Sequence, residues 1–285
     1  MNVYRWETGP VQPGIKALNY LRRSLPLIPE SALKNAFRSK DVKMNGVRIS
    51  PEDHILAGAV MEVYTAAGAV LSVIYEDERV LVINKPAGLC TQDVYCGMTV
   101  QTLAQAHCGE NCEPRLCHRL DTRTSGLLVI AKDDESEREI TGAFKNRDVS
   151  KEYECLVKGE MRPKEAMCQA YLIKDAEVGR VRVISHRTPG AKEIKTAYRT
   201  LSMQGEISRL RVQLLTGRTH QIRAHLAYLG HPLLGDDIYG DREFSRRNAS
   251  VGNLKLCAVS LTLRFSPGSL LRSLDGREFT VPAPF

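Results

Sequence analysis

Short apolar runs separated by turns constrain the fold of residues 70–285 more than any other feature of the sequence. VLSVIY, VLVINK and LLVIAK are rich in valine, leucine and isoleucine, and KEYECLVKG, RLRVQLL and VSLTLRF follow them. In KEYECLVKG, Tyr153, Cys155 and Val157 share one face, because successive side chains of a strand point to opposite sides. Turns such as KPAGL interrupt the runs. The pattern predicts a sheet-dominated α+β fold.

One helix is well marked in this part of the chain. We expect it to begin at or near Thr219 and to bury Ile222, Leu226 and Leu229 before Gly230 ends it. The strand before it leads through a glycine turn to Arg218, and functional side chains are often presented at such element ends. An arginine that only caps or pairs locally is the alternative.

The first 68 residues form a unit of their own, which ends near the small-residue stretch TAAGA, and the second unit covers residues 69–285. Two short helices come first, and Ser31 is the expected cap of the second. In VKMNGVRI, apolar residues alternate on either side of Asn45-Gly46, which is a strong hairpin signal. The pattern predicts a small α/β unit.

Composition limits the possible partners and the compartment. Forty Lys and Arg against 33 Asp and Glu give a net charge of +7, which suits an anionic partner but also fits a basic solvated surface. Eight cysteines, with no secretory signal segment, indicate a reducing compartment, and we expect a cytoplasmic protein. No apolar run reaches the length of a membrane span, so no membrane role is expected.

A group of cysteines and histidines lies close enough together along the chain to suggest a zinc site. Structural zinc sites pair their ligands in two separated knuckles, whereas this group has no second knuckle, so we expect no metal. Its members are His107, Cys108, Cys112, Cys117 and His118.

The segment CHRLDTRTSGLLVIAK places one acid among bases directly before an apolar strand. Asp121 lies close to Arg119 and Arg123 along the chain. A guanidinium both orients a carboxylate and keeps it ionised, and such an Asp can act as a nucleophile, a general base or a metal ligand. A structural salt bridge is the competing interpretation.

HRLDTRTSGLLVIAK resembles the signature of the RluA-type pseudouridine synthases. Further stretches resemble other motifs of that family, in family order: VINKPAGL, KEYECLVKG and LLTGRTHQIRAHLAYLGHPLLGDDIYG. KTAYRTL and LKLCAVSLTLRF also have counterparts, so the resemblance spans about residues 70 to 285. It implies a pseudouridine synthase catalytic domain with a mixed, largely antiparallel sheet and flanking helices.

The first unit resembles the S4-type RNA-binding domain over LPLIPESALKNAFRSKDVKMNGVRI, the Gly58 turn and the strand MEVY. It departs from the S4 pattern at Gly58-Ala59, where family members usually carry Gly-Asp. A small helical-hairpin packing module is the alternative. The resemblance implies that four cations face RNA phosphates: Lys34, Arg38, Lys40 and Lys43.

The synthase resemblance assigns roles by position. It implies that Asp121 is the catalytic aspartate, that Arg218 pairs with it, and that Tyr153 lies against the uracil ring and assists late proton removal. Arg119 would enter the space left by the extruded nucleotide, and Arg123 would join it in binding RNA.

The implied activity is isomerisation of specific uridines in structured RNA, with ribosomal RNA favoured over transfer RNA. A carboxylate suffices as a nucleophile toward the sugar or as a base that starts glycal formation, so neither route needs a cofactor. We expect a monomer.

Two alternatives make different predictions. A catalytically silent RNA-binding protein would bind RNA equally well after Asp121→Ala. A hydrolase that uses Asp121 as a nucleophile would act on small substrates without RNA, but the sequence supplies no clear oxyanion site for it.

Overall fold

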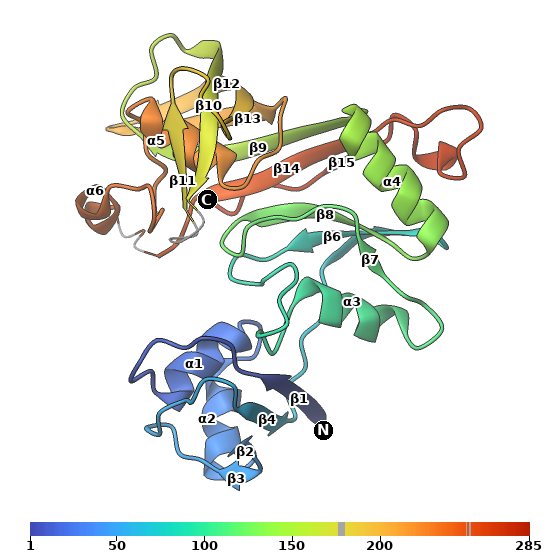
Figure 1. The fold of residues 1–285 in the computed structure, drawn as a ribbon, viewed down its shortest axis with the longest axis vertical. Helices are drawn as coiled ribbons and strands as arrows, with labels where there is room; N and C mark the ends of the chain where they lie inside the picture. The colour runs from blue at the N-terminus through green and yellow to red at the C-terminus, as the bar shows by residue number, and fades with distance from the viewer. Residues whose placement is uncertain (176–179, 249, 251) are drawn as a thin grey trace.

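The computed structural model describes residues 1–175, 180–248, 250 and 252–285, and Figure 1 shows their arrangement. A small four-stranded sheet at the N-terminus has the strand order β1-β4-β2-β3. Its strands are β1 (Asn2–Glu7), β2 (Val42–Met44), β3 (Val47–Arg48) and β4 (Val60–Thr65), and α1 (Ala17–Ser24) and α2 (Glu30–Arg38) pack with them.

The expected hairpin is present between β2 and β3. Asn45 and Gly46 both have positive φ values, 52° and 78°, as a tight primed turn requires. The expectation that Ser31 caps the second helix is wrong. Pro29 occupies the N-cap position and Ser31 lies inside α2, because the fixed φ of proline suits a helix start.

An eleven-stranded sheet dominates the rest of the chain, with the order β11-β10-β12-β13-β9-β14-β8-β6-β5 and two short strands beside it. Among the described strands, β14 and β8 pair in parallel and the other pairs are antiparallel, so the predicted mixed sheet is confirmed. The strands are β5 (Val73–Glu76), β6 (Val80–Lys85), β7 (Arg115–Leu116), β8 (Ser125–Ala131), β9 (Val149–Lys158), β10 (Glu165–Asp175), β11 (Arg180–Ile184), β12 (Lys192–Gln204), β13 (Ile207–Leu214), β14 (Leu256–Leu263) and β15 (Glu278–Thr280).

Helices cover parts of both faces of this sheet (Figure 1). They are α3 (Val100–Cys108), α4 (Asp134–Asn146), α5 (Gln221–Tyr228), α6 (Arg242–Arg247) and the 3-10 helix η1 (Arg272–Leu274). No helix in the described part of the chain has the length and apolar character needed to cross a membrane.

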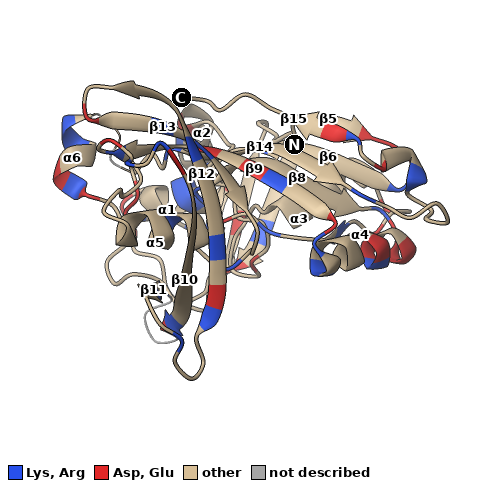
Figure 2. Cartoon of the chain, turned by 90° about the horizontal axis from the view of Figure 1, so that it is seen from above, with Lys and Arg blue, Asp and Glu red and all other residues tan. Residues whose placement is uncertain are grey.

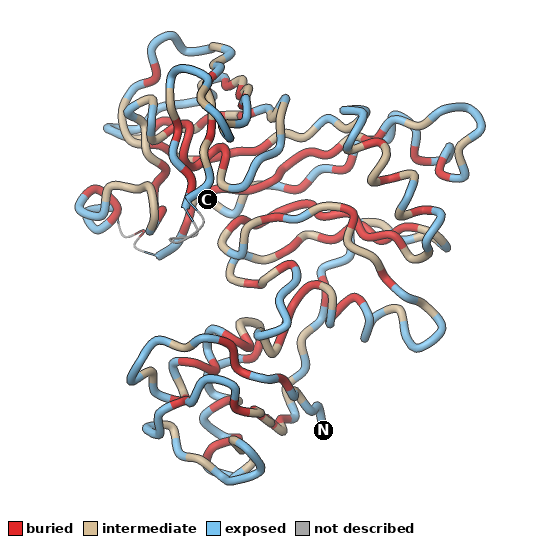
Figure 3. Tube along the Cα trace, in the orientation of Figure 1, coloured by how far each residue is buried: buried red, intermediate tan, exposed pale blue. Residues whose placement is uncertain are grey.

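Strand β6 shows why its run of apolar residues is continuous. Val80 and Val82 belong to one buried cluster, which also holds Ile140 of α4, while Leu81 and Ile83 belong to the cluster on the opposite face. Both faces are therefore covered, and both need apolar side chains. The buried segments in Figure 3 follow these central strands.

The second of these clusters continues from the sheet into the N-terminal unit. It includes Trp6, Leu21 and Phe37 as well as Ile83 of β6. Trp6 donates a hydrogen bond to the Tyr20 hydroxyl at 3.1 Å. The small and large sheets are thus joined by packed side chains.

Candidate active site

A cavity of about 570 Å³ lies where the loop before β8, the strand β9 and the turn before α5 meet. Four of the residues singled out in the sequence line it: Arg119, Asp121, Tyr153 and Arg218. Its size is in the range of small-molecule sites. Arg123 is not among the lining residues, and its guanidinium lies 3.3 Å from Asp237 instead.

The arginine that pairs with Asp121 is Arg223, and the pairing expected for Arg218 is therefore wrong. Nη1 of Arg223 lies 3.4 Å from Oδ2 of Asp121, whereas the described ion pairs include none between Arg218 and Asp121. Arg223 lies in the first turn of α5, and its side chain is buried in the protein interior. Arg218 lines the cavity from the turn before the helix.

A buried carboxylate fixes the position of Arg223. Asp236 accepts two hydrogen bonds from it, at 2.7 Å from Nε and 2.8 Å from Nη2, in the bidentate arrangement that suits a guanidinium. The backbone N–H groups of Ile238 and Tyr239 also donate to Asp236. Arg223 is therefore held on one side and presents its remaining nitrogen to Asp121.

His220 is the second group beside Asp121, with Nε2 3.7 Å from Oδ2. Burial lowers the pKa of His220, although the charge of Asp121 opposes this shift, so the ring is neutral at pH 7. The Tyr239 hydroxyl accepts from the Val181 N–H at 3.0 Å and has its own hydrogen to donate to Nδ1 of His220, also 3.0 Å away. In the tautomer in which Nδ1 accepts this hydrogen bond, the ring proton is on Nε2, the nitrogen that faces Asp121.

Tyr153 is a buried ring in the wall of the cavity. Burial and the nearby charge of Asp121 raise the pKa of its hydroxyl above the ordinary value. The phenol is therefore protonated at neutral pH, and a neutral phenol is a weak proton acceptor. Tyr153 is therefore a neutral aromatic ring in the cavity wall and not a phenolate base.

Cations surround the single carboxylate. Of the lining residues that the structure describes, six are Lys or Arg and Asp121 is the one acid: the cations are Arg119, Lys145, Arg147, Lys151, Arg218 and Arg223. Charges of both signs are spread over the rest of the molecule in Figure 2. The cavity is thus locally suited to an anionic ligand.

Three of these cations were missed in the sequence. Lys145 lies in the last turn of α4, Arg147 follows the helix, and Lys151 is in β9, at the first position of the stretch KEYECLVKG. The available signal was the basic stretch KNRDVSK, which runs from the end of α4 into the strand of Tyr153. Nothing local in that stretch shows that it faces Asp121.

A buried lysine holds the loop that carries Asp121. Nζ of Lys85 donates to the backbone carbonyls of Pro86 at 3.1 Å, Leu89 at 2.8 Å and Thr122 at 3.1 Å. Burial lowers the pKa of Lys85 to about 8. Since Thr122 follows Asp121, this lysine ties the turn after β6 to the catalytic candidate.

The four cations predicted to face RNA in the N-terminal unit do not line the cavity. Lys34 forms an ion pair with Glu30 at 2.6 Å, and Arg38 donates to the Asn35 side chain at 3.4 Å. Nζ of Lys43 lies 5.3 Å from the centroid of the Tyr64 ring. Lys40 has a left-handed φ of 62° just after α2.

The cysteines and histidines weighed as a zinc site have other contacts. His118 is partly buried and accepts a hydrogen bond from the Val129 N–H at 3.0 Å. Burial lowers the pKa of His118 to about 3, which keeps its ring neutral. His107 lies 2.8 Å from Glu76.

Comparisons with known proteins agree with this geometry. The family model described as RNA pseudouridylate synthase matches residues 79–228. The ribosomal large subunit pseudouridine synthase C of Vibrio vulnificus strain CMCP6 is 32% identical over 270 residues, covering 87% of this chain and 84% of the relative. The protein of the same name from Escherichia coli strain K12 is 31% identical over 280 residues, covering 90% and 87%.

Two human structures share the fold. Human RNA Pseudouridylate Synthase Domain Containing 1 matches with a TM-score of 0.63 and 26% identity, covering 77% of this chain and 86% of that chain. Human RNA Pseudouridylate Synthase Domain Containing 4 matches with a TM-score of 0.61 and 24% identity, covering 75% and 88%.

Proposed function

Because the chain belongs to the RNA pseudouridylate synthase family, we propose that it isomerises specific uridines of ribosomal RNA to pseudouridine, with Asp121 as its catalytic carboxylate. The assignment of Asp121 rests on its being the one acidic side chain in the described part of the cavity wall, which also carries six Lys or Arg. Ribosomal RNA is the favoured substrate because the relatives' names specify the large ribosomal subunit.

The reaction breaks the N1–C1′ bond of uridine, turns the detached uracil, forms a C5–C1′ bond and releases the C5 proton. Asp121 acts as a nucleophile on the sugar or as the base that starts glycal formation at C2′, and both routes need it ionised. Arg223 supports this state, since its guanidinium lies 3.4 Å from the carboxylate. The N–H of His220 adds a second favourable dipole.

Recognition of the extruded nucleotide falls to the walls of the cavity. A uridine in folded RNA must leave its stack, which costs a few kcal/mol. We assign the Tyr153 ring to packing against uracil and Arg119 to filling the vacated space, since both line the cavity and stacking offsets part of that cost. Because the Tyr153 hydroxyl is protonated, we expect Tyr153 to contribute less to removal of the C5 proton than to packing against uracil.

The N-terminal unit is proposed to bind RNA as an S4-like domain. Its two helices and hairpin have the expected order, and Lys34, Arg38, Lys40 and Lys43 lie on or after α2 and on β2. We also propose a cytoplasmic location, supported by eight free cysteines. We also propose that the protein acts as a monomer.

Release of tritium from C5-labelled uridine tests the assignment. Unmodified large-subunit ribosomal RNA and transfer RNA transcripts are incubated with wild type, Asp121→Asn and Arg123→Gln. Wild type should release tritium, and Asp121→Asn should be slower by at least about 1,000-fold, because it keeps the shape but loses the charge.

Arg123→Gln is the matched control, since Arg123 lies in the same signature but outside the cavity. Since Arg123 is proposed to bind RNA and pairs with Asp237, Arg123→Gln should raise KM for RNA while kcat at saturating RNA stays far above that of Asp121→Asn. RNA binding by wild type without tritium release would favour the silent binding protein, and release by Asp121→Asn at the wild-type rate would remove Asp121 from the reaction.

A further inference from the structure

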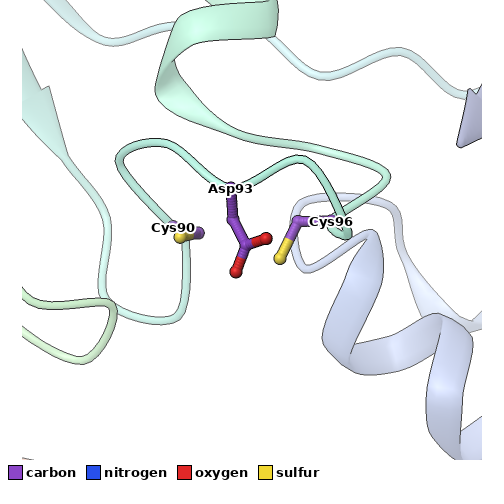
Figure 4. Close-up of side chains that lie close together, drawn as sticks. All are labelled: Cys90, Asp93 and Cys96. Atoms are coloured by element: carbon purple, nitrogen blue, oxygen red, sulfur yellow. The ribbon is translucent and has the colours of Figure 1, made fainter. Parts of the chain in front are cut away.

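Two cysteines and an aspartate gather on the loop between β6 and α3, away from the residues that line the cavity. One ligand atom from each of Cys90, Asp93 and Cys96 lies within 4.8 Å of the other two. Figure 4 shows the three side chains close together on this loop. Their spacing is C-x2-D-x2-C, and they lie outside the group of cysteines and histidines described above.

Backbone contacts hold the ends of this loop together. Cys90 and Thr99 form a parallel bridge, and the Val100 N–H donates to the Cys90 carbonyl at 2.9 Å. Within the loop, Oδ1 of Asp93 accepts from the Tyr95 N–H at 2.9 Å, which orients the carboxylate and leaves its other oxygen available. The three ligand groups are therefore brought together by the fold of the loop.

We propose that Cys90, Asp93 and Cys96 bind one Zn²⁺ ion. Two thiolates and one carboxylate are a donor set that zinc accepts, and a soft sulfur pair disfavours Mg²⁺ or Ca²⁺. Three protein ligands leave a fourth tetrahedral position, which a water can fill because Asp93 is exposed and both cysteines are partly exposed. This assignment replaces the expectation from sequence that the chain holds no metal.

The ion would sit between the N-terminal unit and the loop of Asp121. On one side, a Cβ at Gly97 would lie 2.7 Å from the Trp6 ring, so the loop backbone packs directly on that ring. On the other, the Thr91 hydroxyl donates to the Leu120 carbonyl at 2.7 Å, next to Asp121. Zinc would brace this connection, and its binding is independent of the catalytic assignment.

A second cysteine pair on the chain offers a matched control. Sγ of Cys112 donates to the Lys132 carbonyl at 3.5 Å, and a charge interaction links the Lys132 ammonium to Cys108 and Cys112. No described acid completes a three-ligand group with this pair.

The test uses the full chain, reduced with a phosphine and stripped of metal, and titrated with Co²⁺ as the probe. Thiolate-to-cobalt charge-transfer absorption should appear and saturate at one ion per chain, and Zn²⁺ should displace it. Zn²⁺ affinity, measured against a chromophoric chelator, should fall by at least about 10- to 100-fold in Cys96→Ser and Asp93→Asn, because loss of even an outer-shell partner costs that much.

The double variant Cys108→Ser/Cys112→Ser should bind as wild type does. Circular dichroism checks that each variant is folded, and Zn²⁺ should raise the Tm of wild type but not that of Cys96→Ser. Equal affinity in wild type, Cys96→Ser and Asp93→Asn overturns the proposal. A second result would also overturn it. Thiol trapping at cell lysis would find Cys90 and Cys96 joined in a disulfide, and the reduced protein would bind no cobalt.

Discussion

At the scale of single residues, Asp121 is the last of three charged side chains that contact one another in turn, starting from a buried carboxylate. Asp236, whose side chain is fully buried, grips Arg223 through two hydrogen bonds, and Arg223 in turn faces Asp121. A buried carboxylate is tolerated here because a guanidinium and two backbone N–H groups satisfy it. The arrangement holds the Arg223 guanidinium in place beside Asp121.

Replacing Arg218 and Arg223 by lysine, one at a time, tests which arginine is the functional partner of Asp121. Lysine cannot bind Asp236 in a bidentate manner and reach Asp121 as well, so Arg223→Lys should lower kcat by about 100-fold. Arg218→Lys should mainly raise KM, since Arg218 lines the cavity from a turn. Single-turnover tritium release measures both variants.

Arg223→Lys alters a buried ion pair and can therefore reduce the folded fraction of the enzyme. Urea unfolding measures that fraction, and the kcat of the variant is corrected for it. A larger kcat loss in Arg218→Lys than in Arg223→Lys would restore the original assignment of the pairing arginine.

At the scale of elements, β14 sets the distance between the two catalytic candidates. Ala258 of β14 pairs with Gly126 of β8 on one side and with Tyr153 of β9 on the other. Asp121 precedes β8 by a short turn. Gly126 has a φ of 111°, and a side chain there would overlap the backbone of Ala258. The parallel crossing of β8 and β14 therefore needs glycine at this position.

Gly126→Ala should lower the free energy of unfolding by at least about 2 kcal/mol, because it adds both backbone strain and overlap with β14. Gly142→Ala is the matched control, since Gly142 lies inside α4 with no atom within 4 Å of the added carbon. It should raise stability by up to about 1 kcal/mol. Urea denaturation measures both, and equal effects would refute the close-approach argument.

At the scale of the whole molecule, two units share one buried cluster, and the catalytic cavity concentrates positive charge. Its walls come from segments that are far apart in the chain, including the stretch after α4 and the turn before α5. RNA binding by such a surface releases counterions, so affinity falls as salt rises.

The double variant Lys145→Gln/Arg147→Gln should make the plot of log affinity against log salt shallower by about 1 to 2, since each neutralised phosphate contributes about 0.7 to 0.9. Arg115→Gln should leave the slope unchanged, because Arg115 already faces Glu113, Asp134 and Glu137. Filter binding of a large-subunit ribosomal RNA transcript over a salt series measures the slopes. Equal slopes for all three proteins would mean that the cavity does not contact the backbone phosphates.

Local patterns in the sequence were sufficient for much of the architecture. Alternation predicted the face shared by Tyr153, Cys155 and Val157, all three of which lie in one buried cluster, because side-chain direction in a strand depends only on neighbouring residues. Gly230, with a φ of 88°, ends its helix as expected. The family motifs led to Asp121, and that residue does line the cavity.

Tertiary contacts decided the rest. The partners of Arg223 lie 13 and 102 residues away, so its three-dimensional role left no local trace, whereas Arg218 stood at a visible turn. The position of Lys145, Arg147 and Lys151 beside Asp121 became apparent only in the folded chain, whereas Cys90, Asp93 and Cys96 lie within one short loop of the sequence. Periodicity records which face of an element is buried, but which charges meet depends on long-range packing that short segments do not encode.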